Sequence, residues 1–202
     1  MVYKTLPKKV EKELLEALLS FTLVYEGQLL EHNPQKPQFS HTHEIRKVFH
    51  RQLKRLREEH FFLRDIKPEE LAAQHEVGGY KYVPLVTKET KKSKLHCSLK
   101  ILFLYQNLLQ NIDNQLKTIF DSLSLPVSKD DLDGHEAGSS KENPFFCLLE
   151  DESLIMNTQL ETDLLLKPKK EESNGNDVLL IIGVRIQPII FFYPAGIDSY
   201  LS

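Results

Sequence analysis

The sequence has little cysteine and no long uninterrupted apolar run. Only Cys97 and Cys147 occur among 202 residues, and no CxxC motif is present. A disulfide framework and a thiolate zinc site are therefore excluded, and a reducing compartment is expected. The longest apolar run, Val178 to Tyr193, contains Arg185 and Pro188. A membrane span needs about 20 apolar residues, so this run predicts none.

The motifs of common enzymes are also missing. There is no Gly-x-Ser-x-Gly elbow, and Gly78-Gly79 lies outside any phosphate-binding glycine motif. Eight histidines raise a metal site as a possibility, and His41, His43 and His50 lie closest together. The acids near them are few and the surrounding charge is positive, which repels a dication. We therefore expect no enzyme, metal, cofactor or small-molecule substrate, and an enzyme stays only a third hypothesis.

Charge is distributed unevenly along the chain. Residues 1–100 contain 19 Lys and Arg against 13 Asp and Glu, a net charge of +6. Residues 101–202 contain 7 against 16, a net charge of −9. A polyanion would therefore bind the N-terminal half. The first nine residues are charged and lack an apolar core, which predicts no signal peptide.

The segment from Glu44 to Arg57 is the most informative part of the sequence. Apolar residues recur at helical spacing, and six cations occupy the remaining arc: Arg46, Lys47, Arg51, Lys54, Arg55 and Arg57. Like charges on one short helix repel each other, so an anionic partner is the usual reason for such a face. The alternative is an ordinary surface helix whose counter-ions come from neighbouring parts of the fold.

The remaining sequence predicts a mainly α protein in three parts. Residues 1–125 are expected to form a small antiparallel helical bundle, with helices over 8–30, 44–60 and 92–123. Tyr80–Pro84 is expected to be irregular or extended. Residues 126–177 read as a largely disordered acidic linker with a short helix, because they offer little to bury. Residues 178–202 form an apolar tail that could be a strand or a hairpin arm.

A resemblance adds to this interpretation. The residues that carry it are Leu23-Val24-Tyr25, His32-Asn33, Gln35-Lys36, Phe39, His41, Ile45, Val48 and Leu53-Lys54-Arg55-Leu56. Residues 10–65 resemble the N-terminal helical domain shared by nucleolus and neural progenitor protein and the helical subunit specific to ribonuclease MRP. The resemblance implies a noncatalytic subunit of a nucleolar ribonucleoprotein that processes ribosomal RNA precursors.

Together these patterns predict a noncatalytic RNA-binding or scaffold subunit of a nuclear or nucleolar ribonucleoprotein. Its partners would be structured RNA and other protein subunits, without a membrane. The predicted nucleic-acid-binding residues are His32, Asn33, Gln35, Lys36, His41, Arg46, Lys47, Arg51, Lys54, Arg55, Arg57, Lys91, Lys92 and Lys94. The alternative is a protein–protein adaptor in a nuclear complex whose basic helix binds an acidic partner.

Overall fold

A four-stranded sheet, two α-helices, a short 3-10 helix and a second, smaller sheet make up the part of the protein that the structure describes. The computed structural model describes residues 19–30, 39–60, 75–87, 95–105, 112–128, 132, 142–165 and 177–188. The elements are β1 (Leu19–Gln28), α2 (Phe39–Glu59), β2 (His75–Val77), β3 (Tyr80–Val86), β4 (Leu95–Tyr105), α4 (Ile112–Leu123), β5 (Phe145–Leu149), the 3-10 helix η4 (Glu152–Leu154), β6 (Ile155–Leu164) and β7 (Asp177–Pro188).

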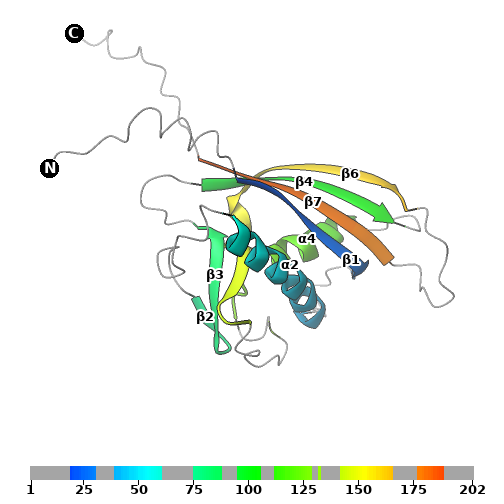
Figure 1. The fold of residues 1–202 in the computed structure, drawn as a ribbon. Coiled ribbons are helices and arrows are strands. Elements are labelled where there is room, and N and C mark those ends of the chain that lie inside the picture. The colour runs from blue at the N-terminus through cyan, green and yellow to red at the C-terminus, as the bar shows by residue number, and fades with distance from the viewer. Residues whose placement is uncertain are drawn as a thin grey trace, which may run out of the picture.

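The larger sheet has the order β1-β7-β4-β6. β7 runs antiparallel to both β1 and β4, and β6 runs parallel to β4. Helices α2 and α4 lie on one face of this sheet, beneath it in Figure 1, and β2, β3 and β5 form the smaller sheet beside α2. No described element covers the opposite face of the larger sheet.

The prediction of a mainly α helical bundle is wrong. Strands take up 52% of the described residues and helices 34%. The predicted helix over residues 8–30 is a strand in its described part, because Leu19–Gln28 forms β1. Leu23 and Tyr25 are buried, and the residues on either side of each are exposed. This is the two-residue period of a half-buried strand. Phe21 and Tyr25 are four apart, so they also fitted a helical stripe.

The predicted third helix is divided between two kinds of structure. Among its described residues, Leu95–Tyr105 forms β4 and Ile112–Leu123 is helical, as α4. The buried side chains of β4 alternate, with Leu99, Ile101 and Phe103 facing the helices. Leu102 and Leu104 occupy other positions of β4, so Leu95, Leu99 and Leu102 also matched the apolar spacing of a helix. The prediction of helix α2 is confirmed, and of the two alternatives for Tyr80–Pro84 the structure shows the extended one, as part of β3.

The C-terminal part of the chain contributes three strands. The mainly α fold class included a disordered segment after residue 125, but β5 and β6 form there, and β5 is largely buried. β7 lies in the segment that could be a strand or hairpin arm, and it pairs along its whole length with β1 and β4. Leu180, Ile182 and Val184 of β7 are 0–1% exposed, so this strand is at the centre of the core.

A side chain of α2 also pairs with the edge of the larger sheet. The Gln52 carboxamide accepts a hydrogen bond from the Val24 backbone N–H at 2.9 Å and donates one to the Val24 carbonyl at 2.7 Å. The carboxamide thus replaces a neighbouring strand at one position of edge strand β1. This pairing ties α2 to the sheet by polar contacts as well as by apolar packing.

Candidate anion-binding face of helix α2

Helix α2 is buried on two sides, which leaves a narrow polar strip exposed. One buried side consists of Ile45, Phe49 and Leu53, each no more than 4% exposed, and it packs into the core beneath the larger sheet. The other consists of His43, Arg46 and His50, each no more than 3% exposed. This second side was not foreseen from the sequence, because it consists of polar residues that the pattern assigned to solvent.

Arg46 is a structural residue, which corrects its assignment to nucleic-acid binding. Its Nε donates to the Ser124 carbonyl at 3.1 Å, and its Nη2 donates to the Asp121 carbonyl at 2.7 Å. Both acceptors lie at the C-terminal end of α4, where a helix leaves carbonyls without intrahelical partners and where a positive charge is favourable. Arg46 therefore joins the two helices and does not reach solvent.

His50 lies in a cluster of rings beneath α2. Its ring stacks on Phe145 with centroids 4.2 Å apart, and its Nδ1 accepts a hydrogen bond from the Phe146 backbone N–H at 2.9 Å. Burial and, to a smaller extent, the nearby positive charge of Lys54 lower the pKa of His50 to about 4. His43 also stacks on Phe145, at 5.8 Å. His50 is therefore a neutral packing group at neutral pH, and His43 packs on the same aromatic ring.

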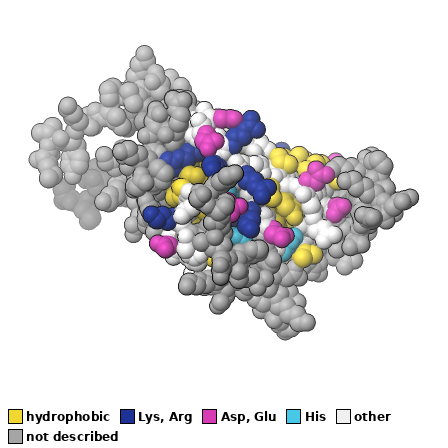
Figure 2. Space-filling model, turned by 60° about the horizontal axis from the view of Figure 1, so that its bottom comes forward, with side chains coloured by type: hydrophobic (Ala, Val, Ile, Leu, Met, Phe, Trp, Pro, Cys, Tyr) yellow, Lys and Arg dark blue, Asp and Glu magenta, His cyan; other side chains and the backbone are white. Residues whose placement is uncertain are grey.

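The exposed strip of α2 carries four of the five other Lys and Arg residues that were predicted to bind nucleic acid from this helix. We call Lys47, Arg51, Lys54 and Arg55 the cationic ridge. Arg51 and Arg55 are exposed, and the other two are half-buried. Arg55 forms an ion pair with Glu59 at 2.7 Å. Figure 2 shows Lys and Arg side chains gathered over the middle of the helix side of the molecule, with Asp and Glu around and between them.

Spacing within the cationic ridge favours contact with an anion. Lys47 and Arg51, like Arg51 and Arg55, are four residues apart, and like charges at this spacing destabilise a helix. Within the described part of the chain, no carboxylate forms an ion pair with Lys47 or Arg51. An external anion would relieve the repulsion at these positions.

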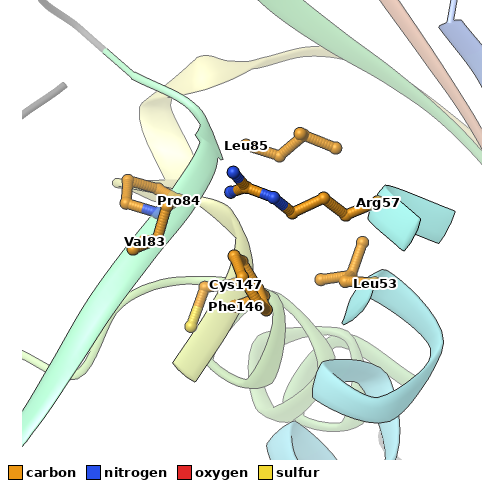
Figure 3. Close-up of a pocket in the computed structure, with 7 residues that line it drawn as sticks. All are labelled: Leu53, Arg57, Val83, Pro84, Leu85, Phe146 and Cys147. Atoms are coloured by element: carbon orange, nitrogen blue, oxygen red, sulfur yellow. The ribbon is translucent and has the colours of Figure 1, made fainter. Parts of the chain in front are cut away.

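Arg57 belongs to a different environment. Its guanidinium group lies over the Phe146 ring, 5.1 Å from the centroid, and points toward β3 (Figure 3). The small pocket around it is otherwise apolar, with Leu53, Val83, Pro84, Leu85, Phe146 and Cys147 as its lining. Arg57 is therefore directed away from the cationic ridge and is stabilised by the aromatic ring.

Of the other predicted binding residues, His41 is the one that the structure describes, and it does not join the ridge. The Nε2 atom of His41 accepts a hydrogen bond from the Leu30 backbone N–H at 3.1 Å, and burial lowers its pKa. His41 is therefore a neutral acceptor beside β1. The residues outside the described parts of the chain are His32, Asn33, Gln35, Lys36, Lys91, Lys92 and Lys94.

Groups that could catalyse a reaction or bind a metal are not assembled in the described part of the protein. There, no three His, Cys, Asp or Glu side chains are close enough to hold a metal ion. Cys97 and Cys147 are free and buried, and burial raises the pKa of both thiols to about 12. Neither sulfur is thus available as a thiolate nucleophile near neutral pH.

Comparisons with known proteins add no relative. No family model, curated protein or solved structure matches the chain. The resemblance of residues 10–65 to the ribonucleoprotein subunits therefore stays a prediction. Neither of the helices described here is both long enough and apolar enough to span a membrane.

Proposed function

We propose that the protein is a noncatalytic subunit that binds structured RNA through the cationic ridge of α2. The observation that supports this is the placement of four Lys and Arg residues along the only exposed strip of a helix that is otherwise buried. A helix rises about 1.5 Å per residue, so the ridge from Lys47 to Arg55 spans about 12 Å. Such a ridge can reach several phosphates on one side of an RNA.

The ridge contacts the RNA backbone and does not read bases. The ridge carries no aromatic side chain, and the nearby Phe146 ring is already in contact with His50 and Arg57. The deep, narrow major groove of an RNA duplex is also closed to direct reading by side chains. We therefore expect affinity that depends on salt and shows little sequence preference.

The nature of the RNA is proposed from the resemblance alone. The likeness of residues 10–65 supports a ribosomal RNA precursor as the ligand, other ribonucleoprotein subunits as partners, and the nucleus or nucleolus as the location. These details are separate from the RNA-binding proposal, which is supported by the ridge.

Fluorescence anisotropy with a labelled RNA hairpin and the full chain tests the proposal. If about three phosphates are contacted, affinity falls roughly 20–40-fold between 50 and 200 mM salt. Arg51→Glu should remove most of the binding and leave the melting temperature unchanged. Arg185→Glu is the matched control, because Arg185 is exposed on the opposite face of the larger sheet. Equal losses in both variants, or affinity independent of salt, would contradict the proposal.

An acidic protein segment is the second candidate ligand. The ridge is short, and exposed Glu44 and Glu58 lie close to it along the helix, with Glu59 paired to Arg55. A short acidic peptide fits such a mixed surface more easily than a long polyanion. Pull-down after nuclease treatment separates the two, because only a protein partner survives nuclease and is lost in the Arg51→Glu variant.

A further inference from the structure

The two edges of the larger sheet differ in how they are covered. At β1, the Gln52 carboxamide occupies the backbone groups of Val24. At β6, the only described neighbour is β4, which pairs with one side of the strand. Eight of the ten β6 residues are exposed, including Met156 at 63% and Leu164 at 58%. An exposed edge of this length is a template for pairing with another strand.

The backbone groups on the free side of β6 can be identified. The Leu165 N–H donates to the Tyr105 carbonyl at 2.8 Å, so the backbone groups of residue 165 point toward β4. Successive residues of a strand alternate in this direction. The even-numbered residues Thr158, Leu160 and Thr162 therefore direct their N–H and C=O groups away from β4. Leu164 does so too, but its N–H already donates to the Asp163 carboxylate.

The side chains of β6 lack the features that usually prevent edge pairing. The strand contains no Lys, Arg or Pro. Its two carboxylates already have contacts within the chain. Glu161 forms an ion pair with Lys100 at 2.9 Å, and Asp163 accepts a hydrogen bond from the Leu164 N–H at 2.7 Å. The edge therefore presents little unpaired charge to an approaching strand.

We propose that β6 pairs with β6 of a second copy of this chain, antiparallel, about a twofold axis at Leu160. Residues directly opposite in such a pair lie on the same face. The pairing of β6 with β4 shifts register at Met156, so the regular part of the strand begins at Asn157. In that part this register places the following pairs opposite each other: Leu160 and Leu160, Thr158 and Thr162, Gln159 and Glu161, Asn157 and Asp163. Each carboxylate then faces a carboxamide, and Leu160 faces Leu160.

The neighbouring registers are less favourable. An axis at Glu161 places the two Glu161 side chains opposite each other, and like charges in this position are destabilising. An axis at Gln159 places Leu160 opposite Thr158 and separates the two Leu160 side chains. The register at Leu160 also uses the outward backbone groups of Thr158, Leu160 and Thr162, so hydrogen bonding and side-chain pairing agree.

The dimer contains one continuous eight-stranded sheet. Because opposite residues share a face, the helices of both copies lie on the same side of this sheet. The two cationic ridges therefore lie on one side of the dimer. Self-pairing is nevertheless independent of RNA binding, and it can be measured on the protein alone.

Sedimentation velocity over a range of concentrations of the full chain tests the proposal. We expect a concentration-dependent dimer. Gln159→Lys places a cation opposite Glu161 twice per dimer and should tighten association roughly tenfold, whereas Gln159→Glu should weaken it by a similar factor. The matched control is Gln28→Glu on β1, the other edge, which should change nothing.

A backbone variant distinguishes pairing of β6 from other contacts. Thr158→Pro removes an outward N–H and leaves the hydrogen bonds to β4 in place, so the dimer should be lost while the circular dichroism spectrum is retained. A monomer at every concentration would overturn the proposal. A dimer that responds equally to the Gln28 and Gln159 changes would overturn it as well.

Discussion

Arg46 and Arg51 are five positions apart on α2, yet their environments differ completely. Arg46 is 3% exposed and donates to two carbonyls at the end of α4, whereas Arg51 lies on the exposed strip. A buried charge is tolerated only when it is paired, and its removal leaves the acceptors without donors. The same residue type therefore has a structural role in one position and is available for binding in the other.

This difference predicts opposite results for two alanine substitutions. Arg46→Ala should lower the free energy of unfolding by about 3 kcal/mol, because two charge-assisted hydrogen bonds are lost in a buried place. Arg51→Ala should change it by less than about 0.5 kcal/mol. Urea denaturation of both variants provides the measurement. Equal destabilisation would mean that Arg51, like Arg46, has a structural role.

His50 predicts a loss of stability in acid. Its pKa is about 4 in the folded protein, against about 6.5 for an unperturbed histidine. Between these values the unfolded chain binds a proton that the folded chain does not, so stability falls as pH decreases from 6.5 to 4. We expect a loss of about 2 kcal/mol across this window.

The variant His50→Gln tests the source of this pH dependence. Glutamine keeps an acceptor for the Phe146 N–H and does not titrate. Its unfolding free energy should therefore depend less on pH between 6.5 and 4 than that of the parent protein. His41, whose pKa is also lowered by burial, should leave a smaller slope in the same direction. Identical slopes in both proteins would exclude His50 as the cause.

At the scale of elements, α2 stabilises the edge of the larger sheet as well as its face. Removing the Gln52 carboxamide by Gln52→Ala breaks two hydrogen bonds to Val24. Val24 is 41% exposed, so water replaces part of the loss, and we expect a decrease in unfolding free energy of about 1–2 kcal/mol.

Hydrogen exchange locates this effect. The Val24 amide should exchange faster in Gln52→Ala, whereas amides of β4 at the centre of the sheet should show only the global change. Glu58→Ala on the exposed side of α2 is the control and should leave the Val24 amide unaffected. Unchanged protection at Val24 would contradict a role for Gln52 at this edge.

At the scale of the molecule, the larger sheet joins parts of the chain that are far apart in sequence. β7 lies between β1 and β4, which do not pair with each other. A fragment ending at residue 125 therefore keeps two strands of this sheet and loses the strand that connects them. The N-terminal and C-terminal halves form one core.

We predict that truncation after residue 176 abolishes cooperative unfolding. The fragment lacks Leu180, Ile182 and Val184, whose side chains are fully buried between the helices and the sheet. Thermal melts followed by circular dichroism should show a sigmoidal transition for the full chain and a gradual change for the fragment. A sigmoidal transition in the fragment would show that β7 is dispensable.

The sequence by itself determined helix α2, and it allowed an extended structure for Tyr80–Pro84 and a strand in the apolar segment that forms β7. A helix makes its hydrogen bonds within its own residues, so its periodic pattern is sufficient evidence. Only the tertiary structure decided that Leu19–Gln28 is a strand, because its hydrogen bonds come from β7 at the other end of the chain. It also decided which cations of α2 face solvent, since the burial of Arg46 depends on α4 packing against it.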